Sequence, residues 1–196
     1  MTRTVSPSTV SLSDSTRVWE DTRAKSTSFF CYRAPVRVDA VLLRELKDVA
    51  MRSGGRNARI CLHEGPDAAF HEMIILEKRG GYLRPHKHLT KGESYHAIEG
   101  ALGAFIFDES GRIVDTCRIG EGGAIAYRVG ANMFHAVIPL TDYVIYHEAK
   151  PGPFLGLHDS VYPDWAPDGA DPEAVAVFRR RLLEALDGHA SDDRSA

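Results

Sequence analysis

The sequence predicts an all-β domain, a two-sheet jelly roll with one helix before it and one after it. From residue 59 to residue 150 the chain consists of short runs rich in β-branched and aromatic residues, separated by Gly, Pro and Asp turns. Apolar residues recur with helical spacing over 39–51 and again over 172–186. The chain has 196 residues, 43% of them hydrophobic, which suffices for the core of one domain.

The N-terminal part is expected to contain an arm and then a helix. Residues 1–27 have little periodic apolar content and are expected to form a flexible arm. Asp39 can cap the first helix, because its side chain can accept hydrogen bonds from the free backbone N–H groups of the first turn. Gly54 and Gly55 are typical of a helix end. This helix is expected to cover one end of the barrel.

The strands are expected to form a meander of hairpins. The clearest turn ends at Gly111, where glycine can adopt the positive φ that closes a tight hairpin. Pro172 is typical of the first turn of the second helix, and the residues after it form an apolar face that ends near Leu186. The expected division is therefore an arm over 1–27, a single domain with helical flanks over 28–187, and a polar tail over 188–196.

Composition narrows the function classes. The net charge of -3 and the pI near 6.3 argue against an electrostatic nucleic-acid binder. Three widely spaced cysteines favour neither a disulfide framework nor a cysteine zinc site, and they fit a reducing cytoplasm. The N-terminus lacks the apolar stretch of a signal peptide or a membrane span. We therefore expect a cytoplasmic protein that binds neither nucleic acid nor membrane.

The most informative local feature of the chain is a pattern that predicts a metal site, in which two histidines alternate along an extended segment. If residues 86–88 are extended, His86 and His88 project from the same face, as two ligands of one ion must. Glu93 would then return on the next strand, and His135 offers a further ligand downstream. Imidazoles with one carboxylate suit a first-row divalent metal and leave coordination positions open. For His135 an ordinary packed histidine is the alternative.

The spacing Gly80-x5-His86-x-His88-x4-Glu93-x6-Gly100 resembles the first motif of the cupin superfamily at every defining position. The second cupin motif is less complete, since Gly130 and Asn132 replace its usual Pro and Gly before His135. Asn tolerates the left-handed backbone conformation better than most residues, so the turn that delivers His135 can survive. The resemblance implies a double-stranded β-helix barrel that holds one divalent transition metal: iron, zinc, manganese or nickel.

A narrower resemblance, spanning about residues 38–187, is to the WbuC-type cupin-fold metalloproteins. Its residues are Arg59-Ile60-Cys61-Leu62-His63, His71-Glu72-Met73, Arg84-Pro85-His86-Lys87-His88, Glu93-Ser94-Tyr95-His96, His147-Glu148 with Gly152-Pro153-Phe154, and Trp165-Ala166-Pro167. This resemblance implies a role in bacterial surface-polysaccharide synthesis and leaves the reaction open.

Four further residues are candidates for substrate binding or catalysis. Arg59 and His63 would share one strand face and bind substrate, Arg59 through a carboxylate or phosphate; a salt-bridged arginine and a hydrogen-bonded histidine are the alternatives. Tyr95 has the same predicted facing as Glu93 and can hydrogen-bond to substrate, or it is a core residue. His147, in phase with Ile145, is a candidate general base or makes a structural hydrogen bond.

The sequence favours a metal-dependent enzyme that acts on a small polar metabolite, anionic or sugar-derived, in bacterial polysaccharide or specialised metabolism. Iron would support oxygenation, whereas zinc, manganese or nickel suits isomerase, lyase or hydrolase chemistry. The alternative is a non-catalytic cupin module that binds or senses a metabolite. Because cupins often associate through sheet edges, we expect a homodimer.

Overall fold

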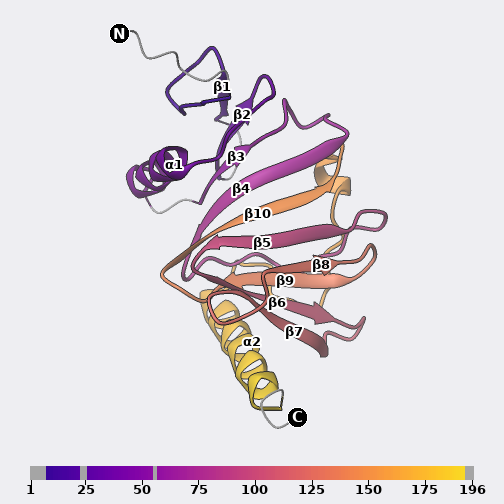
Figure 1. Cartoon of the computed structure of the whole chain (residues 1–196). Coiled ribbons are helices and arrows are strands. Elements are labelled where there is room, and N and C mark those ends of the chain that lie inside the picture. Colours follow the sequence, from indigo (N-terminus) through magenta and orange to yellow (C-terminus); the bar gives the residue numbers. More distant parts are fainter. Residues whose placement is uncertain (1–7, 23–25, 55–56, 193–196) are drawn as a thin grey trace.

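The computed structural model describes residues 8–22, 26–54 and 57–192 and confirms an all-β fold with two flanking helices (Figure 1). The elements in chain order are β1 (Val18–Asp21), β2 (Thr27–Cys31), α1 (Ala40–Arg52), β3 (Ala58–Cys61), β4 (Phe70–Lys78), β5 (Glu93–Glu99), β6 (Ala101–Phe107), β7 (Ile113–Gly120), β8 (Ala126–Val129), β9 (Phe134–Pro139), β10 (Tyr143–Pro151), a 3-10 turn (Gly156–His158) and α2 (Pro172–Asp192). One sheet has the order β1-β2-β3-β4-β10-β5-β8 and the other the order β7-β6-β9.

The first helix packs on the outer face of the larger sheet instead of closing an end of the barrel. Asp39 caps α1 as expected, since its side chain accepts from the backbone N–H groups of Val41 and Leu42. Leu42 and Leu46 lie in one apolar cluster with residues of β3, β4 and β10. Side chains alternate between the two faces of a strand. On β10, Ile145 therefore lies on the outer face beneath α1, and the residues on either side of Ile145 face the interior.

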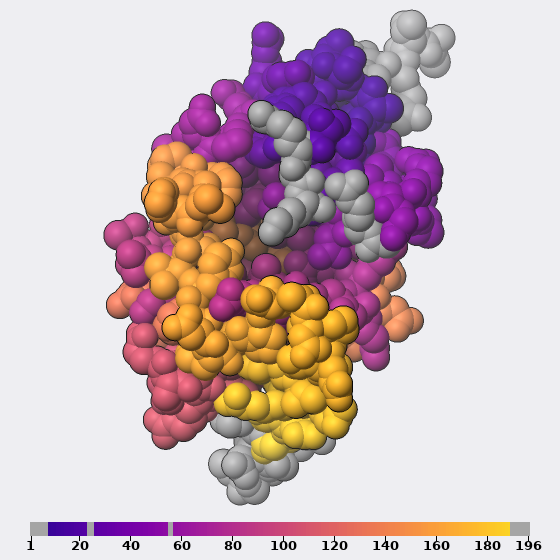
Figure 2. Space-filling view, turned by 180° about the vertical axis from the view of Figure 1, so that it is seen from behind, coloured from indigo at the N-terminus to yellow at the C-terminus, as the bar shows by residue number. Residues whose placement is uncertain are grey.

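The second helix covers the smaller sheet. Phe178, Leu182 and Leu186 of α2 are buried against residues of β6 and β9, among them Phe105. In the view from behind, α2 (yellow) lies across the lower part of the molecule, and the segment that follows β10 (orange) runs down the left side toward it (Figure 2). The helix extends to Asp192, beyond the expected end near Leu186.

The two sheets face each other across an interior that is apolar in part. Met73, Ile75 and Val144 of the larger sheet share a buried cluster with Leu102 and Val137 of the smaller one. The same inner face also carries polar residues on β3, β4, β5 and β10, described below. Residues on the two inner faces of a jelly roll form its core, so these polar side chains mark the place where the core opens into a cavity.

The segment that the sequence assigns to an arm contributes to the structure. β1 pairs antiparallel with β2, and both Val10 and Val18 are buried in the cluster beneath α1. Residues 1–7 and 23–25 of the predicted arm lie outside the described residues. The strand was missed because its four residues include only Val18 and Trp19 as apolar side chains, too few to show an alternating pattern.

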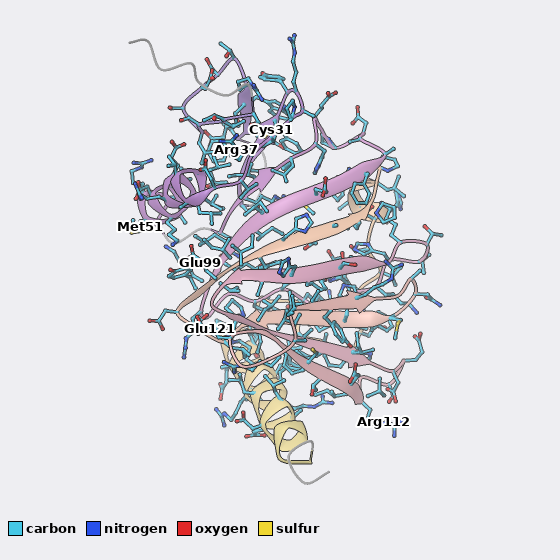
Figure 3. The ribbon with its side chains drawn as sticks, in the orientation of Figure 1. Cys31, Arg37, Met51, Glu99, Arg112 and Glu121 are labelled. Carbon is cyan, nitrogen blue, oxygen red and sulfur yellow. The ribbon has the colours of Figure 1, made fainter. Side chains whose placement is uncertain are left out.

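Hairpins bring the strand ends to opposite sides of the molecule. Gly111 adopts φ 83° in the turn between β6 and β7, as the sequence predicts. Arg112 in this turn and Glu121 after β7 lie at opposite ends of the smaller sheet (Figure 3). All three cysteines are free, as expected; Cys31 lies on β2 and Cys61 on β3, both buried.

Candidate metal centre

Four potential ligands are brought together inside the barrel. His86, His88, Glu93 and His135 are all buried, and one ligand atom from each lies within 4.8 Å of the others. His86 and His135 exchange two backbone hydrogen bonds, His86 N to His135 O at 3.0 Å and His135 N to His86 O at 2.9 Å. This bridge joins the segment before β5 to β9, so residues 49 positions apart in the chain lie side by side.

The turn before His135 forms despite its departures from the cupin pattern. Asn132 adopts φ 60°, the left-handed conformation expected of it, and its backbone N–H donates to the carbonyl of His88 at 2.7 Å. Gly130, which stands in the usual Pro place, precedes the turn. The backbone of this loop is therefore tied directly to one of the candidate ligands.

The three imidazoles share one orientation. Each Nδ1 lies against a backbone carbonyl oxygen, which can only accept, so each ring carries its proton on Nδ1 and presents Nε2 to the centre. The three pairs are His86 with Arg84 O (3.1 Å), His88 with Asp159 O (2.5 Å) and His135 with Met133 O (2.9 Å). Such outer contacts fix the tautomer that a metal requires.

The carbonyl that orients His88 is itself held by a buried ion pair. Lys91 Nζ pairs with the carboxylate of Asp159 and also donates to the carbonyl of Pro153 at 2.5 Å. Lys91 and Asp159 are both buried, although neither residue was predicted to have a role. The segment after β10 is thereby anchored beside the centre.

The electrostatics of the cluster suit a cation. Burial and the neighbouring His135 lower the pKa of His86 to about 4, so that its imidazole is neutral at pH 7. For Glu93, burial favours the neutral form, but its close contacts with His135 and His88 and the charge of Lys150 hold its pKa well below the usual range. Three imidazoles that present Nε2 and one carboxylate form the donor set of a first-row divalent metal.

Unsatisfied nitrogen atoms provide an independent test of this fit. The Nε2 atoms of His88 and His135 are buried and form no hydrogen bond with any described residue, although both lie near the Glu93 carboxylate. Buried polar atoms almost always have partners, so two orphans at the middle of one cluster require an explanation. A metal ion bound by the four residues would provide it.

Two further side chains hold Glu93. The hydroxyl of Tyr95, which is 2% exposed, donates to one carboxylate oxygen of Glu93. Lys150 Nζ donates to the other oxygen at 3.1 Å and also pairs with Glu148 at 2.9 Å. Tyr95 was expected to contact substrate, but its hydroxyl contacts a candidate ligand. It is therefore placed to position Glu93.

The cluster adjoins an internal cavity of about 350 Å³. Its polar lining comes from β3, β4, β5 and β10: Arg59, Glu77, Glu93, Tyr95, Tyr146, Glu148 and Lys150. His86 reaches the same cavity from the loop before β5. A cavity of this size with a few convergent polar groups can hold a small molecule. The predicted position of Arg59 on the inner face agrees with the structure.

His63 and His147 do not reach this cavity. His63 lies beyond the end of β3, accepts a hydrogen bond from the backbone N–H of Glu72 at 3.1 Å and stacks on His71. Burial lowers the pKa of His63 to about 4, so the ring is neutral at pH 7. His147 shares the phase of Ile145, as predicted, but that phase is the outer face, and its Nε2 lies 3.4 Å from Glu72. His147 is therefore not placed to act as a general base in this cavity, and its contact with Glu72 is of the structural kind given as the alternative.

The sequence did not reveal three charged residues of the cavity: Glu77, Glu148 and Lys150. Each stands at a strand position that alternates with residues of the outer face. Once the outer face of a strand is known, alternation therefore places these side chains on the inner face. The signal was present in β10, where Glu148 and Lys150 are in phase with buried Tyr146. The assignment of His147 to the interior reversed this phase.

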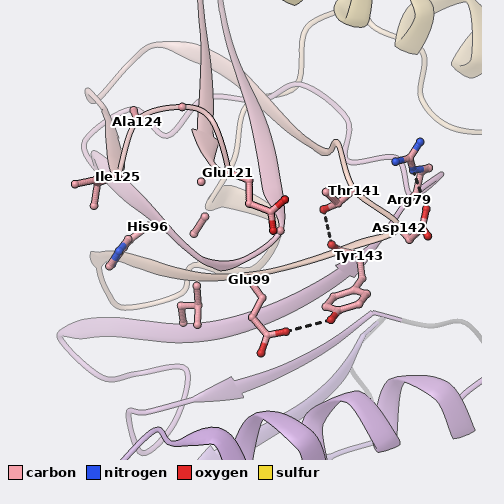
Figure 4. Close-up of a pocket in the computed structure, with 14 residues that line it drawn as sticks. Arg79, His96, Glu99, Glu121, Ala124, Ile125, Thr141, Asp142 and Tyr143 are labelled. Atoms are coloured by element: carbon pink, nitrogen blue, oxygen red, sulfur yellow. Dashed lines mark hydrogen bonds and ion pairs between the residues drawn. The ribbon is translucent and has the colours of Figure 1, made fainter.

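A larger hollow, of about 820 Å³, lies at the end of the sheets where β5 meets β6 (Figure 4). Four of its polar side chains are paired with one another: Tyr143 donates to Glu99 at 3.1 Å, and Arg79 pairs with Asp142 at 3.4 Å. No group of described residues in this hollow has metal-ligand geometry, since the one such group in the described part of the chain is the cluster of His86. The smaller cavity is the better candidate site.

Comparison with sequence families gives one match, to a domain of unknown function (DUF6016), over residues 38–119. The matched segment covers less than half of the 196 residues and includes three of the four candidate ligands. No curated protein matches this chain.

Several solved structures resemble the fold. The capsular polysaccharide assembling protein CapF from Staphylococcus aureus is 14% identical with a TM-score of 0.46, over 54% of this chain and 29% of that one. L-ribose isomerase from Cellulomonas parahominis is 14% identical with a TM-score of 0.45, over 56% of this chain and 70% of that one. Oxalate decarboxylase from Bacillus subtilis is 18% identical with a TM-score of 0.43, over 54% of this chain and 27% of that one.

These likenesses concern the fold alone, and the chain spans only about a quarter of the length of the decarboxylase. The two facing sheets and the flanking helices make the chain a β jelly roll, and its interior holds the buried cluster of three histidines and one glutamate. Among the described residues no helix is long and apolar enough to cross a membrane.

Proposed function

We propose that this protein is a metal-dependent cupin enzyme that acts on a small polar metabolite, anionic or sugar-derived. One observation carries the proposal: a buried set of three histidines and one glutamate adjoins a cavity large enough for such a molecule, and two of the set, His86 and Glu93, line that cavity. A purely structural metal site would be closed by its ligands, whereas a catalytic site keeps access for substrate.

His86, His88, Glu93 and His135 would hold the ion: iron, zinc, manganese or nickel. When bound, it would supply Lewis-acid chemistry or, in the case of iron, oxygen activation. The protein would contribute orientation: Tyr95 and Lys150 fix the glutamate, and backbone carbonyls fix the rings. We assign Arg59 to an anionic group of the substrate, because guanidinium groups bind carboxylate and phosphate in a fixed geometry.

The resemblance to WbuC-type proteins supports a place in bacterial surface-polysaccharide or specialised metabolism. We also propose that the chain forms a homodimer of one domain, predicted over 28–187, to which the structure adds β1 and the buried Val10. β1 and β8 are the outer strands of the larger sheet, and outer strands offer unpaired backbone groups to a second copy. Light scattering of the purified chain would test the mass of the particle.

The test is turnover that depends on both the metal and its ligands. Protein reconstituted separately with Fe²⁺, Mn²⁺, Ni²⁺ and Zn²⁺ is incubated with a panel of sugar acids and sugar phosphates, and the products are analysed by mass spectrometry. We expect conversion with at least one metal and none with the Glu93→Ala variant. Ligand-dependent stabilisation without any turnover would instead favour the non-catalytic binding module.

A further inference from the structure

The part of the cavity furthest from the histidines has its own arrangement of polar groups. Arg59 of β3 is paired with Ile75 of β4, and Glu77 lies two residues further along β4 on the same face. Diagonal neighbours on adjacent strands come within reach of long side chains, so Arg59 and Glu77 face one region of the cavity. Both residues line it.

This region is separate from the candidate metal centre. Lys150 of β10 contacts Glu93, whereas Tyr146, four residues earlier on the same strand, contacts Glu77. Four residues of extended strand span about 13 Å. The cavity therefore extends along β10 from the metal cluster at one end to Arg59 and Glu77 at the other.

Arg59 forms no ion pair within the described part of the chain. Its Nε donates to Ser28 Oγ at 2.8 Å, which fixes the side chain. In the described ranges no carboxylate oxygen lies within 4.0 Å of the guanidinium nitrogens of Arg59. A half-buried arginine that is oriented by a neutral partner and lacks a counter-ion is prepared to bind an anion.

Glu77 is the complementary group. Its carboxylate accepts one hydrogen bond, from the hydroxyl of Tyr146 at 3.2 Å. Burial raises the pKa of Glu77 to about 7, an effect that Tyr146 and Arg59 partly oppose and Glu148 reinforces. Tyr146 and Glu148 of β10 and Arg59 of β3 are the ionisable groups that face Glu77. Burial raises the pKa of Tyr146 well above the usual range, so its hydroxyl stays neutral.

We propose that Arg59 and Glu77 form an oxyanion subsite, which binds the terminal carboxylate or phosphate of a sugar-sized ligand whose other end approaches the metal cluster. Arg59 donates to the anion, and the protonated carboxyl of Glu77 donates its hydrogen to the same anion. An ionised Glu77 would repel the ligand, so binding takes up one proton. This inference rests on the proposed function, because it assigns the far end of the same substrate.

The test is calorimetric titration of the metal-loaded and metal-free protein with D-gluconate, D-glucose 6-phosphate and D-glucose. Gluconate keeps a constant charge between pH 6 and pH 8.5, so its affinity reports the protonation of the protein. We expect gluconate or the phosphate to bind at least tenfold more tightly than glucose, and the stronger of the two identifies the anion. Gluconate affinity should fall about tenfold for each pH unit above 7, as one linked proton requires.

Two variants isolate the groups. Glu77→Gln keeps the shape of the side chain and one hydrogen-bond donor, so this variant should bind gluconate with little pH dependence. The difference between the pH slopes of wild type and variant then reports Glu77 alone, because other titrating groups contribute equally to both. Arg59→Met should abolish the preference for gluconate over glucose. Glu99→Gln, in the larger hollow, is the matched control and should behave as wild type. Circular dichroism confirms that each variant is folded.

Equal affinity of both anions and glucose, an unchanged pH slope in Glu77→Gln, or no binding of either anion would overturn the subsite. Metal content is measured on the same samples to keep the two proposals apart. Loss of metal binding with anion binding intact would contradict the proposed function and leave the subsite supported. Stoichiometric metal and metal-dependent turnover without anion preference would support the proposed function and contradict the subsite.

Discussion

Replacing Lys150 by methionine is expected to destabilise the metal-free protein and to tighten metal binding. The Lys150 ammonium lies 3.1 Å from Glu93 and 2.9 Å from Glu148, and its side chain is only 16% exposed. Methionine fills a similar volume without the charge. The substitution therefore leaves two carboxylates near each other with no cation between them.

The magnitude follows from these distances. At an effective dielectric constant of about 20, a unit charge about 3 Å away stabilises a carboxylate by roughly 5 kcal/mol. Partial desolvation of both groups offsets some of this, so breaking the buried pair should cost the metal-free protein about 3–5 kcal/mol. A divalent ion at Glu93 would supply the missing positive charge. Zn²⁺ should therefore bind Lys150→Met at least tenfold more tightly than wild type, about 1.4 kcal/mol.

The assay combines urea denaturation of the metal-free and zinc-loaded proteins with calorimetric titration of Zn²⁺. Lys47→Met is the matched control, because Lys47 pairs with Glu99 at 2.5 Å but is 31% exposed and distant from the cluster. The control should lose less than about 1 kcal/mol and bind zinc as wild type does. Equal destabilisation of Lys150→Met with and without zinc, at unchanged zinc affinity, would refute the reasoning.

Three further predictions concern the same molecule. Zinc affinity should fall as the pH is lowered from 8 to 5. Burial lowers the pKa of His88, but its contacts with the Glu93 carboxylate and the Asp159 carbonyl together raise it, and below that pKa a proton occupies Nε2; a flat profile would contradict this. Tyr95→Phe removes the hydroxyl donor to Glu93 and should weaken zinc binding about 10–100-fold with little loss of fold stability, whereas unchanged affinity in the same titration would deny Tyr95 a positioning role. Leu182→Ala leaves a cavity under α2 and should cost about 2–5 kcal/mol in urea denaturation without changing zinc stoichiometry. A loss of metal in this variant would be unexpected.

The candidate ligands could be predicted because their geometry is local. His86 and His88 alternate along three extended residues, so their common facing follows from strand geometry alone. Asn132 also indicated that the turn before His135 could still form, because asparagine tolerates the left-handed conformation, and in the structure its φ is 60°. That these residues bind metal is a prediction that the experiments below test.

The rest of the cavity could not be predicted because it depends on which face of each strand looks inward. β10 has buried residues on both faces, Ile145 against α1 and Tyr146 toward the smaller sheet. Periodicity alone therefore could not choose between His147 and Glu148 as the inward residue. The facing of Glu77 is equally ambiguous from the sequence, because four consecutive residues of β4, from Met73 to Leu76, are buried. Strand pairing and the position of α1 decide the facing, and both are properties of the whole fold.

The most direct test of the central claim is the metal content of untagged protein, purified anaerobically without added metals or chelators and measured by mass spectrometry. Wild type should contain close to one iron, zinc, manganese or nickel ion per chain. His86→Ala and Glu93→Ala should lose it while keeping the circular dichroism of a folded β domain. Full metal retention in both variants, or no metal in wild type even after reconstitution, would contradict the account.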